Sequence, residues 1–352
     1  MQYFSVTSTS GSIAPQGHLG KIDSLNTRQS SLATNKSGSA KTGHGLSGNS
    51  TPGGAKTDIF SADIYPLSIT YHPTHPQNDN CEELEFGSRN STGTWTPFDW
   101  DDPLHGPQSK GEVVTIRTGG TSGTLGSGLW RTGVNITGCN ADGTCDILYS
   151  APLGDETMLL LEGSAEVTVV STGKKYHFEA GSILSHPKYL DLSWHVNGPF
   201  LKKFWTIWDA PPLEGTRSDD LFVGHINDNP PNWTPFSWDE PGHGPQQAGE
   251  FTLVRNTGST GALRVGLWRT GPGIAGSKPD GTTVFEYSAP LGDETIMLLE
   301  GRVTIVEHES GKRHRFKGGD VIALPSGLKI TWTSEATFVK TFYVITNGQL
   351  PG

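Results

Sequence analysis

A nine-residue stretch that occurs twice contains the residues best suited to proton transfer. The sequence Tyr-Ser-Ala-Pro-Leu-Gly-Asp-Glu-Thr is found at 149–157 and again at 287–295. Burial raises the pKa of a glutamate toward neutrality, where its carboxyl group can act as a general acid or base, and a phenol can donate a proton or stabilise an oxyanion. Alternatively, the tyrosine and the glutamate of each copy only form a hydrogen bond with each other and fill space in the protein interior. The pattern predicts four candidate catalytic residues: Tyr149, Glu156, Tyr287 and Glu294.

Histidines that could bind a ligand lie within a longer repeated block. The sequence Trp-Thr-Pro-Phe-X-Trp-Asp, an acidic residue and then Pro-X-His-Gly-Pro-Gln spans 95–108 and 233–246. As a lid or pocket wall, this block would bring His105 or His243 to a ligand, and their charge would change near neutral pH. Alternatively, it is an irregular proline-rich arm that protects the edge of a sheet, and the sequence favours this second interpretation.

Two arginines occupy equivalent places in the hexapeptide Gly-Leu-Trp-Arg-Thr-Gly, at 128–133 and 266–271. Successive side chains of a strand point to opposite faces, but periodicity alone does not say which face is inside. An inward guanidinium would bind a carboxylate or phosphate, whereas an outward one would pair with surface acids. Arg131 and Arg269 are therefore candidate ligand-binding residues.

The candidate residues recur because a whole domain is duplicated. Asp155 and Asp293 are 138 residues apart (293 − 155), and the same step relates Trp95 to Trp233. A period this long exceeds that of any solenoid repeat. The chain of 352 residues is therefore expected to contain two similar lobes.

Each lobe has the pattern of short strands joined by tight turns. Ala165, Val167 and Val169 alternate with polar residues, and 46 glycines favour turns over helices. The sequence predicts an all-β fold of two tandem antiparallel jelly-roll barrels. We expect a disordered Ser/Gly-rich tail at 1–58 and a first lobe with an N-terminal arm at 59–208. A linker at 209–220 then leads to a second lobe at 221–352.

The composition narrows the class of partner. A formal net charge of −10 without a basic stripe argues against nucleic acid and anionic membranes. The chain has no secretory h-region and no apolar run of the roughly 18 residues that cross a bilayer. We therefore expect a cytoplasmic protein that binds a small molecule, with neither nucleic acid nor a membrane as partner.

The cysteines do not form a scaffold or a zinc site. Only three are present, and the short loop between Cys139 and Cys145 could be closed by a disulfide or could hold two ordinary thiols. The second interpretation is favoured.

The second lobe contains a series of short motifs at defined spacing. Asp293-Glu294 is followed by Leu298-Leu299-Glu300-Gly301, by Gly318-Gly319-Asp320, by Leu324-Pro325-Ser326-Gly327 and by Trp332. This series resembles the cupin superfamily. The pattern is most similar to the branch of ureidoglycine aminohydrolase-like and small uncharacterised cupins. The resemblance implies a bicupin of two RmlC-like barrels, and by analogy a possible homodimer.

The resemblance also locates where metal-binding cupins hold an ion. Those members supply two histidines, a glutamate and a third histidine. With the glutamate at Glu156, the first two histidine positions fall on Tyr149 and Ala151, and the third falls near Trp194. In the second lobe the third position falls near Trp332. We expect no cofactor, although a divalent metal stays a lesser alternative, and we take Trp194 and Trp332 as candidate ligand-binding residues.

These features leave two classes of function open. The first is an enzyme, of isomerase, cyclase or lyase type, that acts on a small polar or acidic metabolite by metal-independent acid–base chemistry. The second is a non-catalytic bicupin that binds a small ligand or serves as a scaffold. A metal-dependent hydrolase similar to ureidoglycine aminohydrolase is a further alternative.

Overall fold

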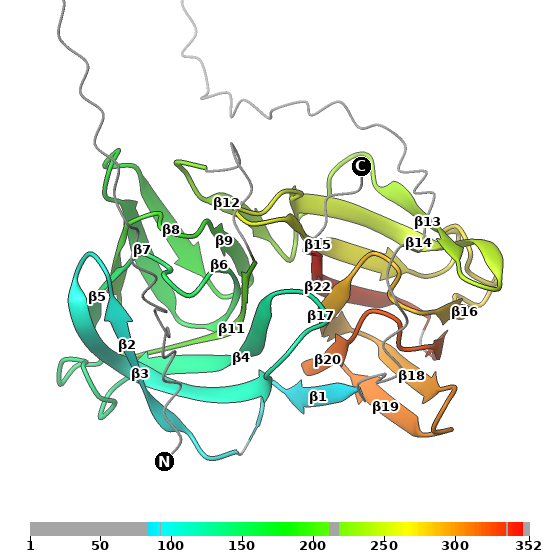
Figure 1. Cartoon of the computed structure of the whole chain (residues 1–352), viewed down its shortest axis with the longest axis horizontal. Coiled ribbons are helices and arrows are strands. Elements are labelled where there is room, and N and C mark those ends of the chain that lie inside the picture. Colours follow the sequence, from blue (N-terminus) through cyan, green and yellow to red (C-terminus); the bar gives the residue numbers. More distant parts are fainter. Residues whose placement is uncertain (1–83, 92, 211–217, 336, 348–352) are drawn as a thin grey trace, which may run out of the picture. The chain divides into compact units, whose positions relative to one another are not determined.

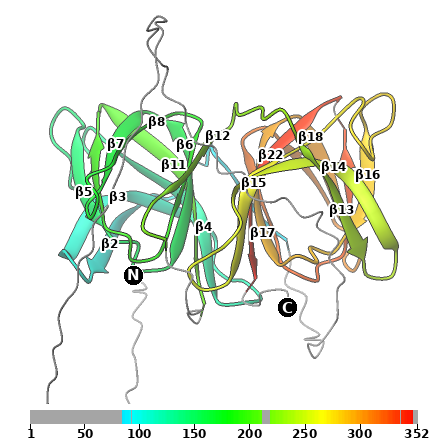
Figure 2. The same ribbon diagram turned by 90° about the horizontal axis from the view of Figure 1, so that it is seen from above.

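The computed structural model describes residues 84–91, 93–210, 218–335 and 337–347. In these ranges every regular element is a strand, and the strands form two barrels, each built from a seven-stranded and a four-stranded sheet (Figure 2). The predicted all-β fold with two tandem jelly-roll barrels is confirmed. The predicted disordered tail and most of the predicted linker lie outside the described residues.

The first barrel follows the first repeat. Its large sheet has the order β12-β9-β6-β11-β4-β3-β2, and its small sheet has the order β5-β10-β7-β8. The strands of the large sheet are β2 (Thr96–Asp102), β3 (Gly106–Arg117), β4 (Thr124–Gly133), β6 (Asp155–Glu162), β9 (Ser182–His186), β11 (Phe200–Asp209) and β12 (Phe222–His225). Those of the small sheet are β5 (Cys145–Tyr149), β7 (Ser164–Val169), β8 (Lys175–Glu179) and β10 (Leu192–Val196).

The second barrel repeats this plan. Its sheets have the orders β1-β20-β17-β22-β15-β14-β13 and β16-β21-β18-β19. The large sheet contains β1 (Glu85–Ser88), β13 (Thr234–Glu240), β14 (Gly244–Arg255), β15 (Ala262–Thr270), β17 (Asp293–Glu300), β20 (Asp320–Leu324) and β22 (Val339–Asn347). The small sheet contains β16 (Thr283–Tyr287), β18 (Arg302–Glu307), β19 (Arg313–Lys317) and β21 (Ile330–Ser334).

The alternation of apolar and polar residues that predicted the strands corresponds to an alternation of buried and exposed side chains. In β7, Ala165, Val167 and Val169 are fully buried, and Glu166 between them is exposed. Side chains of period two therefore fill the interior of each barrel. The opposite faces of the large sheets also carry apolar residues, and these form a third core that joins the barrels. That core includes Leu129, Phe204 and Trp208 of the first barrel and Leu267, Phe342 and Val344 of the second.

The barrels exchange their first strands. β1 precedes the first barrel in the chain but pairs with β20 of the second, and β12 precedes the second barrel but pairs with β9 of the first (Figure 1). The local sequence pattern did not predict this exchange between the barrels. Each large sheet is thereby completed by a segment of the other repeat.

A pair of buried salt bridges crosses between the barrels. Arg117 lies 3.2 Å from Asp293, and Arg255 lies 3.0 Å from Asp155, with both partners almost fully buried in each case. Each aspartate also accepts a hydrogen bond from the backbone of its own barrel, from Lys188 or Ser326. The aspartates beside the repeated glutamates therefore cap a turn and bind the other barrel.

Candidate functional site

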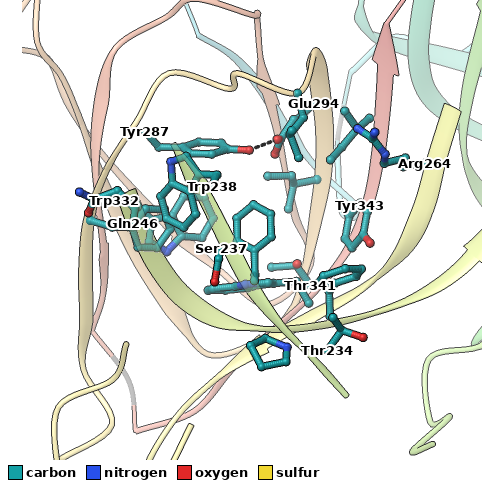
Figure 3. A pocket seen from close by; sticks show the side chains of 18 of the residues that line it. Thr234, Ser237, Trp238, Gln246, Arg264, Tyr287, Glu294, Trp332, Thr341 and Tyr343 are labelled. Atoms are coloured by element: carbon teal, nitrogen blue, oxygen red, sulfur yellow. Dashed lines mark hydrogen bonds between the residues drawn. The ribbon is translucent and has the colours of Figure 1, made fainter. Parts of the chain in front are cut away.

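The interior of the second barrel contains a cavity of about 630 Å³. It lies between the two sheets of the barrel, and most of its wall is aromatic or aliphatic (Figure 3). The aromatic residues of the wall are Phe236, Trp238, Phe251, Trp268, Phe285, Tyr287, Trp332 and Tyr343. A cavity of this size and character can enclose a small organic molecule.

Two charged groups of the cavity wall come from one row across the large sheet. Arg264 of β15 lies opposite Ile345 of β22, which in turn lies opposite Glu294 of β17. All three line the cavity, and Tyr343 lines it two residues further along β22. Figure 3 shows Glu294, Arg264 and Tyr343 on one side of the cavity. Strand register therefore brings an acid, a guanidinium and a phenol to the same wall.

Tyr287 reaches this wall from the small sheet. It is the last residue of β16, and its hydroxyl donates a hydrogen bond to the Glu294 carboxylate (Figure 3). Burial raises the pKa of Glu294 to about 7, because water no longer stabilises the carboxylate. The Tyr287 hydrogen bond and the charges of Arg264 and Arg117 oppose this rise. Glu294 is therefore poised between its two protonation states at neutral pH.

The two phenols remain protonated. Burial, and then the nearby Glu294 charge, raises the pKa of Tyr287 well above its ordinary value, and the same causes raise the pKa of Tyr343. Burial lowers the pKa of Arg264, and the neighbouring Tyr343, Tyr287 and Glu294 oppose this. A guanidinium nevertheless keeps its charge in proteins. The site thus presents two phenol donors and one cation.

The aromatic walls are packed at fixed angles. Phe285 stacks on Trp332 with ring centroids 5.9 Å apart, and Trp238 meets the edge of Tyr287 at 5.4 Å. The Trp238 ring nitrogen donates to Glu240 at 2.9 Å, which fixes the ring. Trp238 belongs to the repeated proline-rich block, whose residues 234–240 form edge strand β13 and whose residues 234–239 line the cavity. The block thus contributes an edge strand to the pocket wall, with an irregular register between Pro235 and Ser237, and is not an arm outside the sheet.

The first barrel brings Tyr149 and Glu156 together in the same way but adds a lysine. Burial and then Glu156 raise the pKa of Tyr149. Lys203, at the position of Thr341 in the second barrel, lies 2.9 Å from the Glu156 carboxylate. Its ammonium group also lies 5.1 Å and 5.5 Å from the centroids of Trp130 and Trp194. In this barrel the glutamate already has an internal cation.

A buried histidine completes this cluster in the first barrel. His186 lies opposite Glu156, and its Nε2–H donates a hydrogen bond of 2.6 Å to the Leu190 carbonyl oxygen. Burial lowers its pKa to about 4, so the ring is neutral.

The other predicted ligand-binding residues lie outside the cavity. Arg269 pairs with Glu250 at 2.6 Å, its guanidinium carbon lies 4.0 Å from the Trp233 ring centroid, and Arg131 makes the matching contacts with Glu112 and Trp95. Arg269 follows Trp268 directly, and because Trp268 points into the barrel, Arg269 points out. Both arginines therefore occupy the outward alternative, and the ligand role predicted for them has no support from their position.

The histidines of the repeated block also face elsewhere. His105 lies 2.7 Å from Asp191, and His243 is exposed. Neither is part of the cavity wall of the second barrel. Of the six predicted ligand-binding residues, Trp332 is the one in this wall, while Trp194 is buried in the first barrel. Cys139 and Cys145 are free thiols.

The donors at the cupin ion position do not fit a transition metal. With the glutamate at Glu294, the two other positions of the first motif fall on Tyr287 and Ala289, and the third histidine position falls near Trp332. An alanine methyl group and an indole ring offer no ligand atom, whereas zinc and iron sites favour imidazoles. Among the described residues, no three His, Cys, Asp or Glu side chains come together as a metal site.

Comparisons with known proteins agree with the fold. Residues 257–343 match the family model of the EutQ-like cupin domain. The matched residues lie in the second barrel, and the chain has a cupin fold with two barrels in tandem. Comparison with curated proteins gives no significant match.

Two solved bacterial structures are similar to most of the chain. One is a protein of unknown function of the DUF861 family from Pseudomonas syringae pv. tomato str. DC3000. It is 17% identical, with a TM-score of 0.51, and the match covers 75% of this chain and 98% of that one. The other, from Pseudomonas aeruginosa and provisionally described as a glyoxylate-induced protein, is 13% identical with a TM-score of 0.53, covering 80% and 97%. These similarities show a shared fold.

Four residues of the two interiors were not predicted: Arg264 and Tyr343 in the second barrel, and His186 and Lys203 in the first. Each of these residues differs from the residue at the same position of the other repeat. Arg264 corresponds to Gly126, and Tyr343 corresponds to Trp205. His186 corresponds to Leu324, and Lys203 corresponds to Thr341. The prediction relied on what the repeats share, whereas inward positions at which they differ would have identified these residues.

In the described residues no helix has the length and apolarity to cross a membrane.

Proposed function

We propose that the second barrel is the active site of an enzyme that moves a proton on a small metabolite without a metal, in an isomerisation, cyclisation or elimination. The observation that carries this proposal is the buried pair of Glu294 and Tyr287 on the wall of a cavity large enough for a metabolite. A carboxyl group placed in this way can meet a substrate atom directly, and the apolar wall excludes competing water.

Each group has a defined part in this chemistry. As a carboxylate, Glu294 accepts a proton from the substrate, and it then returns that proton to another atom of the same molecule or to a departing group. Its pKa of about 7 favours both steps at neutral pH. Tyr287 remains protonated and holds the carboxyl group in place. Tyr343 can donate a hydrogen bond to a substrate oxygen that gains negative charge.

The first barrel is not proposed to react. Its glutamate is paired with Lys203, and the lysine side chain lies among the tryptophans that correspond to the cavity wall of the second barrel. Glu156 and Tyr149 are accordingly structural in this proposal.

A non-catalytic ligand-binding protein is the second candidate. It is favoured by the hydrogen bond from Tyr287, which engages the carboxyl group that would otherwise accept the substrate proton. The cytoplasmic location and the homodimer expected from the sequence stay predictions.

Activity screening with a metabolite extract tests the proposal. The full chain and its Glu294→Gln and Glu156→Gln variants are incubated with the extract, each with and without EDTA, and mass spectrometry follows which metabolites change. We expect a conversion that the Glu156→Gln variant retains and the Glu294→Gln variant loses at least a hundredfold, as typical of a general acid or base. A conversion that persists in Glu294→Gln, or that EDTA removes, contradicts the proposal, and no conversion at all favours the binding protein.

A further inference from the structure

We propose that the ligand of the second barrel is a small carboxylic acid with a flat apolar body, and that its carboxylate binds Arg264. This inference concerns the same cavity as the proposed function, but it predicts binding and does not require turnover.

Arg264 differs from the other arginines of the two large sheets. Arg117 and Arg255 pair with buried aspartates of the opposite barrel, and Arg131 and Arg269 pair with glutamates on the neighbouring strand. Arg264 has no hydrogen bond or ion pair with any described residue, although it is partly buried and lines the cavity. A guanidinium in such a place has lost part of its hydration without gaining an anion, which a bound carboxylate would supply.

The acid nearest to Arg264 does not take this role. Glu294 lies two strands away in the same row, with Ile345 between them, and its carboxylate is bonded to Tyr287. The five donors of a guanidinium match the two oxygens of a carboxylate, so a carboxylate can bind through two parallel hydrogen bonds. Bound there, it would place the rest of the molecule beside Glu294.

The remaining wall determines the body of the ligand. Phe285 and Trp332 form one stacked pair, and Phe236 and Trp238 form another with ring centroids 4.9 Å apart. Such walls favour planar apolar groups, which stack or meet ring edges at similar distances. A polar sugar or a polyphosphate would leave most of its hydrogen-bonding groups without partners here.

The first barrel lacks this site for two reasons. Gly126 occupies the position of Arg264 and has no side chain that could bind a carboxylate. Lys203, a cation in its interior, is already paired with Glu156. One carboxylate site per chain follows.

Calorimetric titration of the full chain tests this inference with 2-naphthoate and with its uncharged analogue 2-naphthamide as probes. We expect one 2-naphthoate per chain, bound at least tenfold more tightly than 2-naphthamide, because a charge-assisted bidentate contact is lost with the amide. Arg264→Gln should weaken 2-naphthoate at least tenfold and leave 2-naphthamide unchanged, and Arg264→Lys should lose affinity to an intermediate degree. The matched control is Arg269→Gln, on the same strand but outside the barrel, which should bind as the parent does.

Equal affinities for the two probes, two bound 2-naphthoates per chain, or no binding of 2-naphthoate at millimolar concentration would each overturn the inference. The comparison of probes needs no variant, so it holds even if Arg264→Gln fails to fold. Failure here is distinct from failure of the proposed function. If Arg264→Gln loses 2-naphthoate while Glu294→Gln retains full turnover, the carboxylate site stands and the acid–base proposal falls.

Discussion

Single residues decide how each barrel accommodates a buried glutamate. In the first barrel, Lys203 forms a direct ion pair with Glu156. In the second, Glu294 accepts a hydrogen bond from Tyr287, and the charge of Arg264 acts without contact. Burial without a direct ion pair raises the pKa of Glu294 to about 7. Near neutral pH, both of its protonation states are therefore populated.

The raised pKa of Glu294 predicts a pH-dependent cost to stability. Between its ordinary pKa of 4.5 and the folded value of about 7, the folded protein holds a proton that the unfolded chain has lost. Stability should therefore fall as the pH rises through this window, by about 3 kcal/mol in total. Glu294→Gln removes this titration and keeps an acceptor for Tyr287. In urea unfolding, the free energy of unfolding of the variant relative to that of the parent should rise by about 3 kcal/mol between pH 4.5 and pH 8.

Glu156→Gln is the matched control for this experiment, since it removes the equivalent carboxyl group from the first barrel. A constant difference between the parent and Glu294→Gln across the pH range would show that Glu294 titrates normally, and the acid–base role would lose its basis.

At the scale of elements, the exchanged strands couple the repeats. The Arg89 N–H donates to the Gly319 carbonyl at 2.7 Å, just beyond the end of β1. In an antiparallel pair every second residue is bonded, so Gly87 is bonded to its partner Val321. In the first barrel, the Ile226 N–H donates to the Gly181 carbonyl just beyond the end of β12. Two residues earlier, Gly224 is therefore bonded to its partner Ile183. One hydrogen-bonded glycine thus lies in the middle of each exchanged strand.

Proline at Gly87 should weaken the second barrel, although this residue precedes the first barrel in the chain. Proline removes the N–H that bonds to β20. Hydrogen exchange measured by mass spectrometry should show at least tenfold faster exchange in Asp320–Leu324 and little change in Ser182–His186.

The reverse pattern is expected for Gly224→Pro, the control that disturbs β12 against β9. If Gly87→Pro instead increased exchange in the first barrel alone, each first strand would belong to its own repeat.

The elements could be predicted from the sequence and their exchange could not. In β7, buried and exposed side chains alternate along consecutive residues. The pattern of Ala165 to Val169 was therefore sufficient to predict this strand. The choice between β9 and β20 as partner for β1 depends on contacts far along the chain, which the local pattern does not encode. Tyr287 and Glu294 were predicted because both repeats retain them, and Arg264 was not, because the repeats differ there.

At the scale of the whole molecule, buried charge joins the barrels. Arg117 bonds to the Glu294 carbonyl oxygen at 3.0 Å and pairs with Asp293, so the first barrel contacts the strand that carries the candidate acid. Arg255 pairs with Asp155 in the reciprocal direction. Removing one partner of such a pair leaves a buried charge without compensation.

Arg117→Met should therefore lower the free energy of unfolding by about 3 kcal/mol, and Arg255→Met should do the same. The control is Arg131→Met, whose pair with Glu112 is partly exposed and should contribute about 1 kcal/mol or less. Urea unfolding measures all three. A cost for Arg117→Met no greater than that for Arg131→Met would mean that the inter-barrel pairs do not hold the barrels together.

The strand exchange also constrains the order in which a ribosome could complete this fold. When β11 has emerged, the first barrel still lacks β12, so the edge of β9 stays open until residues 222–225 are synthesised. β1 is made before the other described strands and must wait for Asp320–Leu324, more than 200 residues later. Throughout that interval the nascent chain presents an unpaired strand and the apolar face that contains Leu129 and Phe204. A growing polypeptide that has not yet reached Asp320–Leu324 therefore exposes surface that promotes aggregation.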